Sequence, residues 1–216
     1  MLENWILEIR KKADTYQSHT WRYQISGNSI ELSVLRHYLK DKEAYRAAVI
    51  AIGRVLKALS YKIENSKSYF LIQSFPSIEN HEVIASIRMD EKKYHESPEN
   101  SFDSDKTDES FEDELKRYTE YYQLKLEHPE QEFIQNCGFG DDKTKSQNWH
   151  LITSKFDNPF TWLNVGYWQE TIAHTFVKKH KREPHFIMNF CRIKGDPKNG
   201  EATSDEVCPQ ILFSFG

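Results

Sequence analysis

The sequence predicts an α+β fold. Helical and strand-like spacings of apolar residues both occur along the chain, and they follow one another in mixed order instead of strict alternation. Aromatic residues fill 13% and hydrophobic residues 38% of the 216 positions, so the chain can form a core. That length suits one sizeable domain and is short for two independent ones, so we expect a single domain over residues 1–216.

A β-hairpin is the clearest local signal in the first half of the chain. Apolar and polar residues alternate over 21–25 and again over 30–34, and Gly27 and Asn28 between them suit a tight turn. Gly53 is the one weak point of the helix that follows. Around the hairpin, the spacing predicts helices at residues 2–14 and 42–60 and strands at 69–74 and 83–89.

An acidic segment follows at about residues 90–114. It holds eleven acids against three lysines, so it carries about −8 of a total net charge of −4. Such a composition favours a solvated loop or insertion over packed structure. A specific acidic docking surface is the alternative.

The second half again mixes helices and strands. Asn158 followed by Pro159 is a good helix start, because asparagine caps the first amides and proline needs no amide donor there. No internal repeat is apparent. Helices are expected at 111–126, from Pro129 to near Gly138 and from Pro159 to about His180, a loop at 137–146, and strands at 149–155, 186–190 and 211–215.

Composition excludes several classes of function. The net charge of −4 and the pI near 6.2 give no electrostatic reason to expect a nucleic-acid partner. No stretch approaches the roughly 18 apolar residues of a membrane span. The first residues also lack the apolar run of a signal peptide, so we expect a cytoplasmic protein without a membrane partner.

Sequence motifs for metal binding and nucleophilic catalysis are absent. The nine histidines and three cysteines show no compact ligand spacing, so no metal site is predicted. The chain also lacks a G-x-S-x-G elbow and a P-loop lysine motif, and no catalytic residue can be named. Several tryptophans could instead line a pocket for a flat ligand or fill an ordinary core, and for Trp21 both interpretations stay open.

Four segments, in the same order, resemble the nitroreductase superfamily. The likeness is closest to bacterial dormancy-type proteins in which one chain carries two nitroreductase-like halves. K-A-L-S-Y at 57–61 is similar to the family's A-A-L-G-Y, and W-L-N-V-G at 162–166 to its W-L-x-A-G. The four segments are the hairpin entry at 13–23, the helix at 44–61, the helix start at 162–167 and the P-Q-I-L-F-S-F-G terminus at 209–216.

This resemblance implies a nitroreductase-like fold, with helices flanking a central antiparallel sheet and flavin mononucleotide (FMN) bound near a homodimer interface. It implies reduction of a small-molecule substrate with NAD(P)H, in which the flavin carries the hydride and the protein orients it. The implied cofactor contacts are Gln17, Ser18, His19 and Trp21 at the ring, Arg22, Lys116 and Arg117 at the phosphate, and Ser214 where the family has an arginine.

The departures from the family fall at these same positions. Gln17 stands for an asparagine, His19 for a glutamine and Thr20 for a proline, and Ser214 cannot supply a positive charge. A second hypothesis is therefore a catalytically inactive relative that keeps the fold for flavin binding or protein interaction. A third class, a partner-binding protein that uses its acidic segment, rests on the charge count alone.

Overall fold

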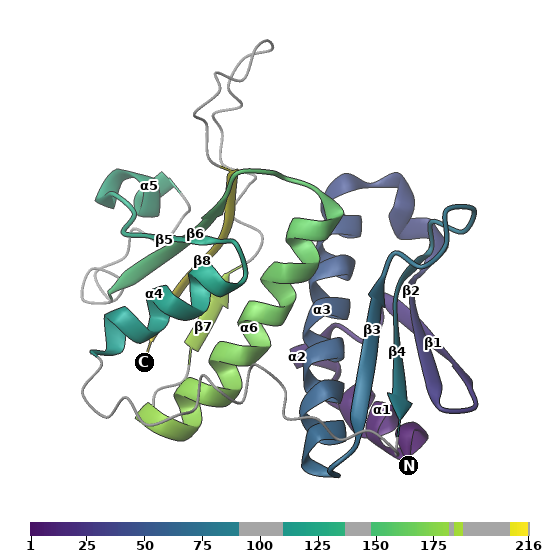
Figure 1. Ribbon diagram of the computed structural model, residues 1–216. Helices are drawn as coiled ribbons and strands as arrows, with labels where there is room; N and C mark the ends of the chain where they lie inside the picture. Colours follow the sequence, from purple (N-terminus) through teal and green to yellow (C-terminus); the bar gives the residue numbers. More distant parts are fainter. Residues whose placement is uncertain (91–109, 137–147, 182–183, 188–207, 216) are drawn as a thin grey trace. The chain divides into compact units, whose positions relative to one another are not determined.

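The computed structural model describes most of the chain as two compact units (Figure 1). The sequence predicts one domain, whereas in the structure each unit contains a four-stranded sheet of its own. Unit 1 comprises Met1–Ser110 and Trp162–Glu170, and unit 2 comprises Phe111–Thr161 and Thr171–Gly216. The described residues are 1–90, 110–136, 148–181, 184–187 and 208–215.

Unit 1 is built around a long helix and an antiparallel sheet. The strand order is β1-β2-β4-β3, and α3 packs on one face of this sheet (Figure 1). The short 3-10 helix η1 leads into α3. The elements are α1 (Leu2–Lys11), α2 (Ala13–Tyr16), β1 (Trp21–Ser26), β2 (Ser29–Val34), η1 (Arg36–Lys40), α3 (Lys42–Asn65), β3 (Tyr69–Ser74) and β4 (Val83–Asp90).

The predicted hairpin is confirmed and organises this sheet. β1 and β2 pair antiparallel from Trp21 opposite Val34 to Ser26 opposite Ser29. Gly27 adopts a φ of 59°, which glycine reaches without steric cost. The Asn28 side-chain amide donates to the Met89 carbonyl, which ties the turn to β4.

The two faces of this sheet differ in polarity. Ile30, Leu32 and Ile87 are buried on the face that carries the core. The opposite face is polar, because Gln24 on β1 pairs with Glu31 on β2, and Glu31 pairs in turn with Ser86 on β4. This alternation is what a strand gives when one face packs and the other meets water.

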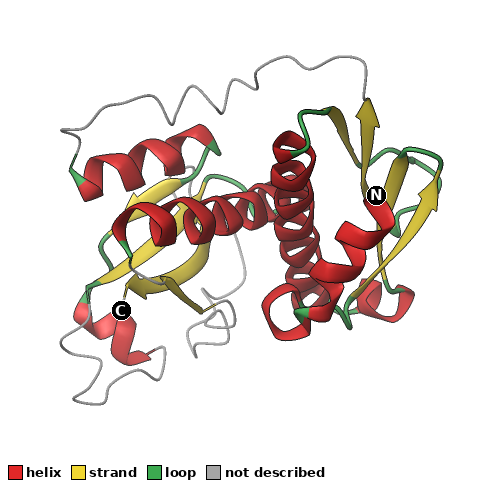
Figure 2. Cartoon of the chain, turned by 90° about the horizontal axis from the view of Figure 1, so that it is seen from below, coloured by secondary structure: helices red, strands yellow, loops and turns green. Residues whose placement is uncertain are grey.

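Unit 2 has a second antiparallel sheet with strand order β5-β6-β8-β7. Helices α4 and α5 lie on opposite sides of it (Figure 2). Ile134 of α5 belongs to a core cluster with Trp149, Leu151 and Leu212. The elements are α4 (Phe111–Tyr121), β5 (Lys125–Glu127), α5 (Gln131–Asn136), β6 (Trp149–Ser154), α6 (Pro159–His180), β7 (Pro184–Ile187) and β8 (Cys208–Phe215), and the middle of α6 belongs to unit 1.

The two units share one topology, although the sequence shows no repeat. In each unit two strands are followed by a long helix (α3 or α6) and then by two further strands. The strand orders β1-β2-β4-β3 and β5-β6-β8-β7 correspond to each other position by position. The pairing of the central strands also shifts at matching places, between Leu32 and Ser33 in unit 1 and between Ile152 and Thr153 in unit 2. When the two central strands are aligned at these register shifts, His150 of β6 takes the position that Ile30 takes in β2.

The α+β prediction is confirmed, and the prediction of one central sheet is corrected to two antiparallel sheets. The single sheet was implied by the nitroreductase resemblance, and the spacing of apolar residues could not test it, because spacing identifies strands without saying which strands pair. The helix predicted at 111–126 ends at Tyr121, since Gln123 adopts a φ of 59° and β5 follows. Most of the predicted acidic loop, 91–109, and the loop at 137–146 lie outside the described residues.

Helix α6 begins as predicted. The Asn158 side chain accepts a hydrogen bond from the Thr161 amide at 3.0 Å, and Pro159 occupies the first turn. Within unit 1, Gly166 of α6 lies against the backbone of α3. A Cβ atom at Gly166 would come 2.1 Å from the Ile50 carbonyl oxygen, and one at Gly53 would come 2.3 Å from the Leu163 carbonyl oxygen. These two helices can therefore pack this closely only with glycine at both positions.

Candidate metal-binding site

A buried histidine lies on the central strand of unit 2. β6 runs between β5 and β8, and all six of its residues are buried. The side chain of His150 is only 2% exposed. Its ring stacks on Phe213 of β8 with centroids 5.1 Å apart, and it meets Phe215 edge-on at 6.1 Å.

The neighbouring strand brings a second histidine to His150. β5 pairs with β6 so that Glu127 faces Leu151, and the next residue, His128, therefore comes opposite His150. The two imidazole centroids are 5.2 Å apart. His128 is exposed, so this pair has one buried and one accessible ring.

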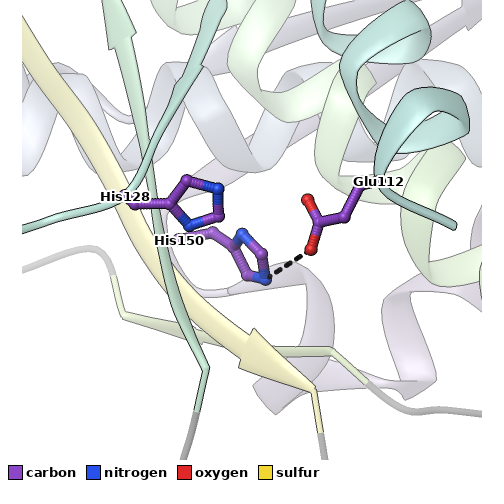
Figure 3. Close-up of side chains that lie close together, drawn as sticks. All are labelled: Glu112, His128 and His150. Carbon is purple, nitrogen blue, oxygen red and sulfur yellow. Dashed lines mark ion pairs between the residues drawn. The ribbon is translucent and has the colours of Figure 1, made fainter.

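Helix α4 supplies a carboxylate to the same place. Glu112 lies in the first turn of α4, and its Oε1 atom is 3.9 Å from Nε2 of His150. Figure 3 shows the carboxylate and the two imidazoles facing one another. Glu112, His128 and His150 each offer one ligand atom, and these atoms all lie within 4.8 Å of one another.

Burial favours the neutral form of His150. Desolvation lowers the pKa of His150, the charge of Glu112 opposes that effect, and His128 adds to it. The buried ring is therefore neutral at pH 7, the form in which imidazole binds metal ions. Nδ1 of His150 has no hydrogen-bond partner among the described residues.

The donors match the preferences of a zinc-type ion. Zinc binds histidine nitrogen and carboxylate oxygen at about 2.0–2.2 Å, so two atoms on one tetrahedral ion lie roughly 3.3 Å apart. The ligand atoms of the cluster lie within 4.8 Å of one another, up to about 1.5 Å farther apart than on such an ion. Binding therefore requires side-chain rotation, for which the exposed Glu112 and His128 have room.

The flavin contacts implied in the first part of the chain lie in unit 1. Gln17 ends α2 with a φ of 46°. Ser18 is buried and its hydroxyl donates to the Arg10 carbonyl at 2.9 Å. Trp21 is 1% exposed and its indole nitrogen donates to the Tyr16 carbonyl at 2.8 Å, so the ring is a core residue.

The remaining implied contacts are divided between the units. In unit 1, His19 is exposed and Arg22 forms an ion pair with Glu82 at 2.5 Å. In unit 2, Lys116 lies on the exposed side of α4, Arg117 stacks over the Tyr118 ring at 5.0 Å, and Ser214 is buried in β8.

No protein-family model and no curated protein matches this chain. None of the described helices is long and apolar enough to cross a membrane. The nitroreductase resemblance therefore rests on the four sequence segments, and its implied contacts stay predictions.

Sequence spacing could not find the cluster. Glu112, His128 and His150 are far apart in the chain, and only the pairing of β5 with β6 and the position of α4 bring them together. One signal was present: His150 lies between the apolar residues Trp149 and Leu151 in a predicted strand. A histidine inside a buried strand is more often a packed residue than a ligand, so the strand alone did not indicate a metal.

Proposed function

We propose that this protein binds a divalent transition-metal ion of the zinc type through Glu112, His128 and His150. The observation that carries the proposal is the geometry of the cluster. Each of the three side chains offers one ligand atom, these atoms lie within 4.8 Å of one another, and Nε2 of the buried His150 is 3.9 Å from Oε1 of Glu112.

The kind of ion follows from the donor set. Two imidazoles and one carboxylate suit zinc, and also iron, cobalt or nickel, better than they suit calcium or magnesium, which prefer oxygen ligands. The three ligands come from α4, from the residue after β5 and from β6. His150 lies on β6, and His128 directly follows β5, the strand paired with β6, so this pairing sets the spacing of the two histidines before an ion arrives.

Titration calorimetry tests this proposal directly. The protein, first stripped with a chelator, is expected to bind one equivalent of Zn²⁺ and to prefer it strongly over Mg²⁺. His128→Ala and Glu112→Gln should each weaken binding at least about tenfold. His185→Ala is the matched control, since His185 is an exposed histidine of unit 2 outside the cluster. Equal zinc binding by wild type and by His128→Ala would refute the proposal.

FMN-dependent reduction of a small molecule with NAD(P)H is a second proposal, supported by the order of the four nitroreductase-like segments. A yellow preparation, or FMN binding with NAD(P)H-dependent bleaching, would support it. Colourless protein that ignores FMN at high micromolar concentration would contradict it and favour a relative without this chemistry. The zinc titration and the FMN titration are independent, so either proposal can fail alone.

A further inference from the structure

We propose that the ion bound at Glu112, His128 and His150 keeps an open coordination position on its solvent side, and that this position takes an exogenous small anion such as a carboxylate. This inference rests on the proposed metal binding and deepens it. Closed zinc sites have four protein ligands, whereas sites that act on a ligand have three and leave a position for water or substrate. Among the described residues, this cluster offers three.

The cluster is closed on one side and open on the other. On the buried side, the His150 ring packs against Phe213 and Phe215, so no additional ligand can approach through the sheet. On the other side, the side chain of Glu112 is 52% exposed and His128 is also exposed. A fourth ligand therefore reaches the ion from solvent.

Two carboxylates near the cluster in sequence, Glu114 and Glu127, have other partners. Glu114 is buried and accepts hydrogen bonds from Nζ of Lys179 at 2.9 Å and from Nε2 of His180 at 3.0 Å. Glu127 accepts a hydrogen bond from the Thr153 hydroxyl at 3.0 Å. Moving either carboxylate to the ion would break these contacts, and for Glu114 it would leave Lys179 without its buried partner.

Charge favours an anion at the open position. A divalent ion with one carboxylate and two neutral imidazoles keeps a net charge of +1, and an ion of this kind is the largest local charge in its site. A neutral ligand such as water fills the position but leaves that charge in place. A carboxylate neutralises the remaining charge of +1, so the site should prefer a carboxylate to a neutral ligand.

Cobalt substitution tests the open position. Co²⁺ is added to the chelator-stripped full chain in chloride-free buffer, and the visible absorption of the bound ion is recorded. Azide and then acetate are titrated into the sample. The expected result is a saturable shift of the visible bands with each anion. His185→Ala should behave as wild type does, and His128→Ala should lose the cobalt spectrum.

The possible outcomes separate the two proposals. If wild type binds no Co²⁺ or Zn²⁺, the proposed function itself fails. If Co²⁺ binds but its spectrum ignores both anions, a protein group closes the site, and only the open position is refuted. Intense near-ultraviolet absorption from a cobalt–thiolate bond would also refute the open position, because it would show a cysteine as the fourth ligand.

Discussion

His150 lies in β6 at the position that Ile30 holds in β2, so the two units differ there by an imidazole against an aliphatic side chain. Both residues are buried, but only the imidazole brings polar atoms into the sheet. A buried polar side chain needs a hydrogen-bond partner or a bound ion to offset its desolvation. This comparison within the chain is independent of the cluster geometry and points to the same residue.

His150→Phe is expected to abolish zinc binding without destabilising the apo protein. Phenylalanine can keep a ring face against Phe213 while it removes the unpaired nitrogen, whose burial costs about 1–3 kcal/mol. Urea unfolding in the presence of a chelator measures the free energy of unfolding. A loss of more than about 1 kcal/mol would show that the imidazole itself stabilises the fold.

Tyr16 gives a second prediction at this scale. Its hydroxyl donates to Oε1 of Glu170 at 2.7 Å, and Arg54 pairs with the other oxygen of the same carboxylate at 3.2 Å. Burial first, and then the Glu170 charge, raises the pKa of Tyr16 above its usual value. The folded protein thus retains this proton at a pH where the unfolded chain, with a pKa near 10, releases it.

The stabilisation from Tyr16 is therefore complete below about pH 10 and declines as the pH rises further. Tyr16→Phe should lower the free energy of unfolding at pH 8, because the bond to a charged carboxylate contributes about 1.5–3 kcal/mol. The difference between wild type and variant should shrink by about 1.4 kcal/mol per pH unit above pH 10. Chemical denaturation at several pH values measures it. A difference that stays constant to about pH 11 would contradict the raised pKa.

At the scale of elements, the contact between α3 and the middle of α6 depends on two glycines. Glycine to alanine in a helix normally stabilises by about 0.5–1 kcal/mol, because glycine is a poor helix former. At Gly166 the sign should reverse, since the new methyl group would meet the Ile50 carbonyl of α3. Backbone atoms cannot rotate away as a side chain can.

Gly166→Ala is accordingly expected to lower the free energy of unfolding by about 1–3 kcal/mol, the usual cost of overpacking. Gly53→Ala in α3 should lower the free energy of unfolding similarly, because its methyl group would meet the Leu163 carbonyl of α6. Lys178→Ala, an exposed position of α6, is the control and should change stability little. Thermal or urea unfolding gives the comparison, and a stabilised Gly166→Ala protein would show that the two helices do not pack this closely in solution.

Helix α4 provides the element-scale test of the metal proposal. Leu115 and Tyr118 bury its apolar side, whereas Glu112 lies in the first turn, where helices fray. An ion bound to Glu112, to His150 of β6 and to His128 directly after β5 ties that turn to the sheet. Hydrogen exchange at residues 112–116 should slow when Zn²⁺ is added to wild type and stay unchanged in Glu112→Gln. Equal slowing in both proteins would place the carboxylate outside the site.

At the scale of the whole molecule, the sequence was informative about elements and uninformative about their pairing. The hairpin at Gly27 and the helix start at Asn158 follow from residues next to each other in the chain, and both are confirmed. The division into two sheets depends on which strands pair, and the two units match in topology without visible sequence similarity. The cluster of Glu112, His128 and His150 could not be recognised from the sequence for the same reason, because His128 and His150 meet only through the pairing of β5 with β6.

Zinc can also report whether the two units unfold together. All three ligands belong to unit 2, so an ion at 100 times its dissociation constant should stabilise that unit by about 2.7 kcal/mol. The hydrogen-exchange rates of amides in β6 and β8 that exchange through opening of unit 2 should then fall by about 100-fold. If the units open independently, amides of β2 and β4 keep their rates. Equal slowing in both sheets would mean that residues 1–216 unfold as the single cooperative domain expected from the chain length, consistent with a helix, α6, that contributes residues to both units.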